Sequence, residues 1–253
     1  MFEVKVVSLL PGLIEPTHQE GVVGRAVTQG LLKVEHINPR EFADDVHRTV
    51  DDRPYGGGPG MVVKYEPLRR AIERGRADLP AASPVVLLSA QGRRFDQAMA
   101  ERLAAAPGLM LVAGRYEGVD ERITTAVDLE LSLGDFVLSG GELAAAVVLD
   151  AVARLLPGVL GHEESAANDS FAQGLLDYPH YTRPDEINGL KVPEVLASGD
   201  HRAIARWRLK QALGRTWVRR PDLLKRRDLN QEERRLLDEY RREFGAPAMH
   251  GMV

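Results

Sequence analysis

The 253-residue chain contains no cysteine. Without thiols it cannot form a disulfide, use a thiolate nucleophile or build a Cys-based zinc or iron–sulfur site. It also has no run of the roughly 18 consecutive apolar residues that span a bilayer. The start, MFEVKVVSLL, lacks the basic region and small-residue cleavage site of a signal peptide. We therefore expect a cytoplasmic protein with no membrane partner.

Common catalytic motifs are missing as well. The seven histidines show no His-Glu-x-x-His spacing, and no Gly-x-Ser-x-Gly elbow occurs. The glycine-rich stretch DDRPYGGGPGMVVK (51–64) lacks the spacing of a phosphate-binding P-loop, and a GxGxxG dinucleotide fingerprint is absent. These absences argue against a zinc protease, a serine hydrolase, a P-loop NTPase and a classical dehydrogenase. The stretch 51–64 is either a tight connecting loop or part of a functional site.

Charge is distributed unevenly along the chain. Residues 183–253 hold 16 Lys+Arg and 11 Asp+Glu, a net of +5, so residues 1–182 carry −9 of the total of −4. The segment 201–227 has ten basic residues, one acidic residue and two interleaved tryptophans. This pattern is typical either of a nucleic-acid contact or of a solvated helical face. Its candidate RNA-binding residues are Arg208, Lys210 and Arg215.

Apolar runs alternate with helix-forming segments in the first part of the chain. This alternation predicts an α/β domain with a largely parallel sheet. Ser139 is expected to cap the last of its helices, with Glu142 in the first turn. The expected strands cover 4–10, 85–92, 109–118 and 129–136, and the expected helices cover 19–32, 95–106, 118–126 and 141–156.

The pattern changes after Gly161. The stretch 162–170 has no periodicity and indicates a connector. Amphipathic helices follow, one starting at a Ser198 or Asp200 cap and one over 229–244. The predicted organisation is an α/β cofactor-binding domain (1–160), a flexible linker (161–171) and a smaller, basic α-helical domain (172–253).

Three predicted strands end in small residues, in the segments 88–92, 113–118 and 132–141. Ligands of parallel α/β sheets bind outside the carboxyl ends of the strands. Apart from Arg93, Arg94 and Arg115, these segments lack basic residues, which argues against a triphosphate. A nucleoside such as S-adenosylmethionine fits better, although each segment alone is also compatible with an ordinary turn.

Several long motifs carry a family resemblance that runs in order from the N-terminus to about residue 225. They are DDRPYGGGPGM, GRYEGVDER, SLGDFVLSGGEL, RLLPGVLGHE, SFAQGLLDYPHYTRP and RWRLKQALGRTW. The chain resembles the bacterial tRNA (guanine-N1)-methyltransferases of the SPOUT class. The resemblance implies a parallel sheet with a deep trefoil knot, a C-terminal helical domain and a homodimer.

The resemblance also implies an activity. A methyl group passes from S-adenosylmethionine to N1 of the guanine 3′ of the anticodon, position 37 and preceded by G, in the anticodon stem-loop of tRNA rather than in DNA. Mg²⁺ assists in the family, although no dedicated metal site is evident in this sequence. By position, the cofactor-binding residues are Leu88, Gly114, Tyr116, Glu117, Leu133, Gly134, Asp135, Phe136, Val137, Leu138, Gly140 and Gly141.

Two further residues match the family's catalytic positions. N1 of neutral guanine carries a proton, so a positioned base must remove it before the nitrogen can attack. By resemblance Asp169 is that base, and Arg154 stabilises the negative charge that develops on O6. The alternatives are a non-catalytic RNA-binding ligand sensor and a SPOUT relative that modifies another RNA position.

Overall fold

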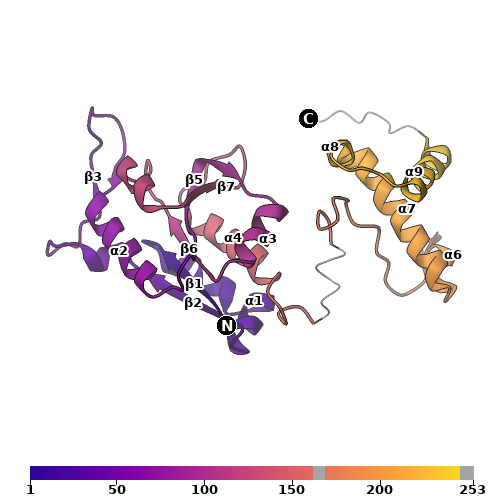
Figure 1. The fold of residues 1–253 in the computed structure, drawn as a ribbon, viewed down its shortest axis with the longest axis horizontal. Helices are drawn as coiled ribbons and strands as arrows, with labels where there is room; N and C mark the ends of the chain where they lie inside the picture. Colours follow the sequence, from indigo (N-terminus) through magenta and orange to yellow (C-terminus); the bar gives the residue numbers. More distant parts are fainter. Residues whose placement is uncertain (162–168, 246–253) are drawn as a thin grey trace. The chain divides into compact units, whose positions relative to one another are not determined.

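The computed structural model describes residues 1–161 and 169–245. The chain divides into two compact units, Met1–Glu163 and Glu164–Val253 (Figure 1). In the residues described, no helix combines the length and the apolar character needed to cross a membrane.

The first unit is built on a parallel sheet with strand order β2-β1-β6-β5-β7. This arrangement confirms the predicted α/β class and places the carboxyl ends of its strands at one edge. A small antiparallel pair, β3 (Asp51–Asp52) and β4 (Val62–Val63), flanks the glycine-rich stretch. The sheet strands are β1 (Phe2–Val7), β2 (Leu32–Ile37), β5 (Val85–Arg94), β6 (Gly108–Ala113) and β7 (Leu129–Ser132).

Both faces of the sheet are covered. β6 is buried along its whole length: Leu109 and Leu111 pack into one apolar cluster, and Met110 and Val112 pack into the other. This follows from the two-residue period of a strand, which sends alternate side chains to opposite faces. The first cluster is completed by α1 (Gly21–Thr28), α3 (Gln97–Ala104) and α4 (Glu142–Ala153), and the second by α2 (Tyr65–Ala77). Short 3₁₀ turns are η1 (Pro11–Leu13), η2 (Glu15–His18), η3 (Pro39–Phe42) and η4 (Glu121–Ala126).

Several element boundaries differ from the sequence-based expectations. β2 and α2 were not expected, and β6 ends at Ala113 rather than at 118 because the chain turns at Gly114. The segment expected as a helix over 118–126 contains only the 3₁₀ turn η4. The predicted Ser139 cap is wrong: α4 starts after Gly141 with no side-chain cap, and its first residue, Glu142, is buried.

The second unit is helical around a small core. Its elements are the hairpin β8 (Glu186–Ile187) and β9 (Leu190–Lys191), α6 (Glu194–Ala197), α7 (His201–Arg219), α8 (Pro221–Lys225) and α9 (Gln231–Phe244). α7 and α9 pack together, and Leu213 and Leu236 are fully buried between them. Of the two caps that the sequence predicts as alternatives, Ser198 and Asp200, it is Asp200 that caps α7 by accepting hydrogen bonds from the N–H groups of Arg202 and Ala203. Asn230 caps α9 in a reciprocal capping box.

The predicted linker 161–171 falls mainly on residues 162–168, which lie outside the described residues. Residues from Asp169 onward already belong to the second unit. The amide of Leu176 donates to the hydroxyl of Thr216 on α7 at 2.8 Å, and Leu175 is buried in the helical core. The chain that carries Asp169 is therefore anchored to α7 a few residues later.

Candidate cofactor pocket and catalytic residues

A cavity of about 330 Å³ opens at the carboxyl ends of β5, β6 and β7. Its size lies in the range of small-ligand pockets. Small residues of the loops that follow these strands contribute to the wall, as the endings of these strands predict. The lining residues are Leu87, Leu88, Ser89, Ala90, Gln91, Gly114, Arg115, Tyr116, Glu117, Gly118, Val119, Glu121, Thr124, Glu130, Leu131, Ser132, Leu133, Phe136, Val137, Leu138, Gly140, Gly141 and Ala144.

Two of these loops are pressed together backbone to backbone. The amide of Gly141 donates to the carbonyl of Gly114 at 2.8 Å. A Cβ at Gly141 would lie 2.8 Å from the Cα of Ala113, closer than carbon atoms normally approach. The loop before α4 can therefore reach the end of β6 only because position 141 has no side chain.

A buried ion pair sits beneath this contact. The Glu142 side chain is fully buried at the start of α4, and its Oε2 accepts a hydrogen bond from Nε of Arg115 at 3.0 Å. Its Oε1 accepts from the hydroxyl of Ser8, after β1, at 3.0 Å. A carboxylate in the first turn of a helix is also favoured by the helix dipole. The two hydrogen bonds join the ends of β1 and β6 to α4.

Gly140 lies directly against this pair. A Cβ there would be 2.5 Å from Oε2 of Glu142 and 2.6 Å from Nε of Arg115. Arg115 also donates to the carbonyl of Ser139 at 3.3 Å. The ion pair thus holds the loop 139–141 against the cavity, and Gly140 makes this close approach possible because it has no side chain.

The electrostatics of the wall favour a cation over an anion. Three carboxylates, Glu117, Glu121 and Glu130, line the cavity, and the charge of the one lining arginine, Arg115, is balanced by Glu142. An anionic ligand would meet a net negative surface. A ligand with a positively charged sulfonium group would be attracted by the same negative surface.

The glycine-rich stretch 51–64 contacts one of these carboxylates. The amide of Glu117 donates to the carbonyl of Met61 at 3.0 Å. A Cβ on Gly60 would overlap the Glu117 side chain, so this glycine leaves the room that Glu117 occupies. The stretch therefore supports the cavity wall and does more than connect β3 to β4.

The structure brings most of the predicted cofactor residues together. Ten of the twelve line the cavity, and Gly134 and Asp135 do not, although they belong to the same loop. Gly134 is held by a hydrogen bond between its amide and the Ser132 hydroxyl at 3.2 Å. Glu130 and the Arg115–Glu142 pair are not among the residues predicted from the sequence. Both partners of that pair stand inside quoted motifs, but a pairing over 27 positions leaves no periodic signal.

The two predicted catalytic residues belong to different units. Arg154 is the half-buried C-cap of α4, where its positive charge suits the negative end of the helix dipole. Asp169 is half-buried, and its carbonyl accepts the amide of Ala172 at 3.3 Å. A turn that begins here places Asp169 at the edge of the helical unit.

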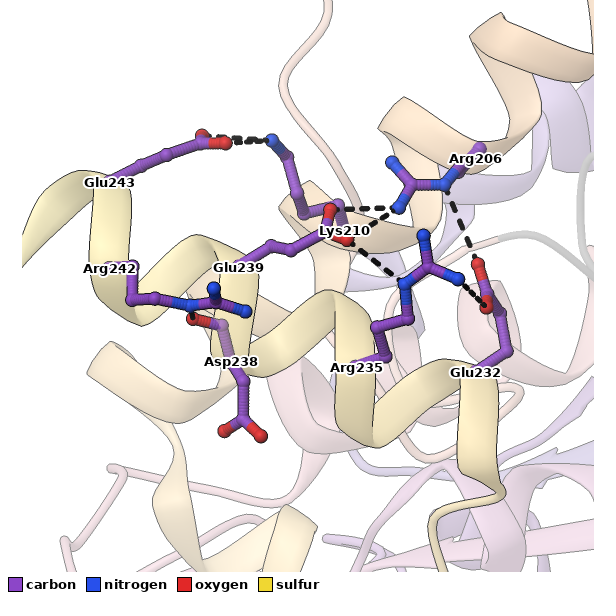
Figure 2. A network of polar contacts seen from close by, with 8 residues as sticks. All are labelled: Arg206, Lys210, Glu232, Arg235, Asp238, Glu239, Arg242 and Glu243. Atoms are coloured by element: carbon purple, nitrogen blue, oxygen red, sulfur yellow. Dashed lines mark hydrogen bonds and ion pairs between the residues drawn. The ribbon is translucent and has the colours of Figure 1, made fainter.

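The three predicted RNA-binding residues all lie on α7 but have different surroundings. Lys210 is paired with Glu243 of α9 at 2.7 Å, and its side chain is only 12% exposed. The guanidinium carbon of Arg208 lies 4.9 Å from the ring centroid of Tyr178. Figure 2 shows that acidic residues of α9 also surround Arg206, which lies 2.7 Å from Glu239. These hydrogen bonds from Arg206 hold the pKa of the Glu239 carboxyl below its ordinary value.

One face of α7 keeps its positive charge. Positions 208, 215 and 219 are separated by seven and four residues, so they lie on one stripe of the helix. Within the described residues, Arg208, Arg215 and Arg219 have no carboxylate partner. We call these three the arginine stripe; Arg206 and Lys210 lie on the face turned to α9.

The described ranges 1–161 and 169–245 bring together no cluster of three or more His, Asp or Glu that could hold a metal ion.

A parallel sheet with a cavity at the carboxyl ends of its strands defines an α/β protein with its candidate ligand site at this edge. The particular family follows from comparison with known proteins. The family model described as tRNA (Guanine-1)-methyltransferase TrmD matches residues 2–226, and the chain belongs to this family.

Curated relatives named tRNA (guanine-N(1)-)-methyltransferase are similar over almost their whole length. The Methylococcus capsulatus protein is 61% identical over 240 residues, 94% of this chain and 96% of the relative. The Nitrosococcus oceani protein is 62% identical over 242 residues, 95% of this chain and 96% of the relative. The Salmonella newport protein is 56% identical over 241 residues, 95% of this chain and 94% of the relative.

We expect Gly140→Ala to weaken binding of S-adenosylmethionine by a factor of roughly 5 to 150, because overpacking at this site costs roughly 1–3 kcal/mol and every 1.4 kcal/mol is tenfold in affinity. Isothermal titration of the purified protein measures the effect. Gly161→Ala is the control, since a Cβ there meets nothing within 4 Å. Equal affinities for both variants would show that the ion pair does not shape the pocket.

Proposed function

We propose that this protein transfers a methyl group from S-adenosylmethionine to N1 of the guanine 3′ of the anticodon in tRNA, position 37, preceded by G. Membership of the tRNA (Guanine-1)-methyltransferase family is the observation that carries the proposal. The cavity supports it independently, because its acidic wall and exposed backbone suit a positively charged nucleoside. A tRNA substrate supports the expectation of a cytoplasmic protein.

The chain's own residues would hold the cofactor in a defined way. Leu88, Gly114, Tyr116, Glu117 and the loop 133–141 form the cradle around the cavity. When bound, the sulfonium supplies an electrophilic methyl group. Tyr116 adopts a positive φ of 60°, a conformation that costs energy for a residue with a side chain and that clusters at functional sites.

Proton removal is assigned to Asp169. The carboxylate accepts the proton from N1 of guanine, which frees the nitrogen lone pair for attack. Arg154 donates hydrogen bonds to the O6 oxygen as it gains negative charge. Because the target atom is hidden within a base stack, the guanine must leave the stack before the carboxylate can reach it.

The proposed organisation follows the sequence-based domains: 1–160 binds the cofactor, 161–171 connects, and 172–253 binds the anticodon stem-loop. A deep trefoil knot belongs to the same proposal. It is supported by the contact between the loop before α4 and the end of β6, which brings two of the cofactor loops to backbone distance. Mg²⁺ remains an expected helper without an assigned position.

A homodimer completes the proposal. Leu143 and Val147, one turn apart on α4, are 52% and 49% exposed. Leu10 and Leu13, in and beside η1, are each 45% exposed, and η1 packs against α4. Neighbouring exposed leucines on one face are typical of a protein–protein interface.

The function is tested with purified protein, unmodified tRNA and S-adenosylmethionine carrying a labelled methyl group. Mass-spectrometric mapping should find the label on N1 of the guanine at position 37. Label on another nucleotide would favour a SPOUT relative with a different target. Absence of transferred label would favour the ligand-sensing RNA-binding protein.

In the same assay, Asp169→Asn should lower the rate of methyl transfer by a factor of about 10² or more, the usual contribution of a general base. Cofactor affinity should be unchanged, because the substitution leaves the residues that line the cavity as they are. Asp228→Asn, an exposed carboxylate of the same unit, serves as the matched control. Near-normal turnover of Asp169→Asn would remove this residue from the mechanism.

The arginine stripe predicts a salt dependence. Arg208→Gln/Arg215→Gln should weaken tRNA binding and reduce the slope of log K against log salt by about 0.7–0.9 for each lost phosphate contact. The double variant Lys210→Gln/Glu243→Gln removes an ion pair without changing the net charge, so its slope should match that of the unmodified protein. If Lys210→Gln/Glu243→Gln reduces the slope and Arg208→Gln/Arg215→Gln does not, tRNA contacts the face of α7 that carries Lys210 and not the arginine stripe.

The dimer proposal predicts that Leu143→Glu/Val147→Glu shifts the protein from dimer to monomer in sedimentation-velocity measurements. Two charges at the centre of an apolar interface would be buried without partners, which strongly disfavours association. Leu190→Glu is the control, because Leu190 is 77% exposed on the hairpin of the other unit. A dimer that survives the α4 substitutions would place the interface elsewhere.

A further inference from the structure

The helical unit contains a cavity of its own, with a volume of about 680 Å³. It shares no residue with the cofactor cavity. Its walls come from the segment 178–185, from Val192, from α6 and from the first half of α7. The lining residues are Tyr178, Pro179, His180, Tyr181, Thr182, Arg183, Asp185, Val192, Leu196, Ala197, Ile204 and Arg208.

Aromatic rings and a guanidinium form one side of this cavity. The rings of Tyr178 and His180 lie 4.7 Å apart between centroids, and Arg208 lies over the Tyr178 ring at 4.9 Å. Tyr181, which is 50% exposed, approaches Trp207 at 6.4 Å. Flat π surfaces and a planar guanidinium are the groups on which single-stranded RNA bases stack.

The rest of the cavity suits a planar ligand with an apolar face and a polar edge. Val192, Leu196 and Ile204 are half-buried and give an apolar wall. Thr182 and Asp185 supply hydrogen-bonding groups. Nε2 of His180 lies 2.7 Å from the Asp177 carboxylate, a contact that fixes the ring at the rim.

The cavity adjoins the positive face of α7, and the two share Arg208. Arg208 lines the cavity and is also the first member of the arginine stripe. A cationic track next to an aromatic platform is the combination that holds single-stranded nucleic acid, because the track binds phosphates and the platform binds a base. A protein partner with an acidic apolar segment would use the stripe but would not require the stacked rings.

We propose that this cavity, here called the helical-unit pocket, takes an unstacked base of the tRNA loop, a base other than the one that is methylated. The proposal rests on the proposed function, since it takes tRNA as the substrate. The pocket would fix the register of the loop by stacking, while the arginine stripe holds the adjoining phosphates. Phosphate contacts position a nucleic acid and base contacts select it, so the pocket would add a second point of recognition.

The test combines a pocket variant with single abasic nucleotides in the RNA. Anticodon stem-loops that lack one base at each loop position in turn are titrated with full-length protein, and binding is followed by fluorescence anisotropy. Tyr178→Leu should weaken binding of the intact stem-loop by about tenfold, and Tyr178→Phe should restore it. One abasic position should weaken binding to the unmodified protein by a similar factor and should have no further effect on Tyr178→Leu.

Phe244→Leu is the control, because Phe244 is an exposed ring of the same unit that stacks only on Tyr240 among the described residues. It should not weaken binding. Circular dichroism should show unchanged helix content for all variants. No base occupies the pocket if every abasic position weakens binding to Tyr178→Leu by the same factor as binding to the unmodified protein. The same conclusion follows if Tyr178→Phe binds the intact stem-loop as weakly as Tyr178→Leu.

Two further readouts separate the possible failures. If the unmodified protein methylates N1 of guanine 37 but shows no coupling between Tyr178 and an abasic position, the pocket proposal fails and the proposed function stands. If no methyl group is transferred although the coupling is present, the pocket proposal stands and the proposed function fails. A change of oligomeric state in Tyr178→Leu with unchanged RNA affinity would assign the pocket to a protein contact.

Discussion

The geometry of the first unit depends on the buried carboxylate of Glu142. It joins Ser8, at the end of β1, to Arg115, after β6, across 134 and 27 positions of the chain. A buried charge that loses its partner costs roughly 3–5 kcal/mol, so each of these segments stabilises the others. The loop 139–141 lies within this arrangement because Gly140 and Gly141 leave room for it. The shape of the cavity is a consequence of that packing.

The same ion pair decides the charge of the cavity. Arg115 stands in the wall, but Glu142 balances it, and the remaining carboxylates Glu117, Glu121 and Glu130 leave a negative surface. Under the proposed reaction the bound donor is a cation, and loss of the methyl group leaves a neutral thioether. The acidic wall therefore stabilises the substrate form more than the product form, which favours release after each turnover.

The sequence predicted the centre of the sheet better than its edges. β6 is apolar and buried along its whole length, β5 begins with the buried run VVLL, and β1 contains only two charged residues among its apolar ones, so these strands are easily recognised. β2 reads LKVEHI, with charged side chains on a half-exposed edge, and this pattern hides a strand. α2 is rich in Arg and Glu and carries Pro67 in its first turn, so only its buried positions identify it. Asp200 could be predicted as a candidate cap because capping depends on neighbouring residues alone. Ser139 fits the same local pattern, but α4 begins only at Glu142, whose side chain is buried by contacts with distant parts of the chain.

The candidate site divides in the same way. The glycines of the cofactor loops could be selected from the sequence because three strand endings share their composition. The Arg115–Glu142 pair could not, because only the packing of α4 against the end of β6 brings the two side chains together. Asp169 and Arg154 came from resemblance alone, since neither a single carboxylate in a connector nor an arginine at a helix end has a distinguishing pattern.

The helical unit shows why a count of charges overstates a binding surface. The segment 201–227 holds ten basic residues, but α9 supplies carboxylates to one side of α7 and pairs Arg206 and Lys210 there (Figure 2). Those pairs stabilise the contact between the two helices and are only weakly available to phosphates. The opposite side keeps Arg208, Arg215 and Arg219 without carboxylate partners within the described residues. The helix thus uses one face to pack and the other to carry net positive charge, and the aromatic cavity beside Arg208 opens on the face that carries the charge.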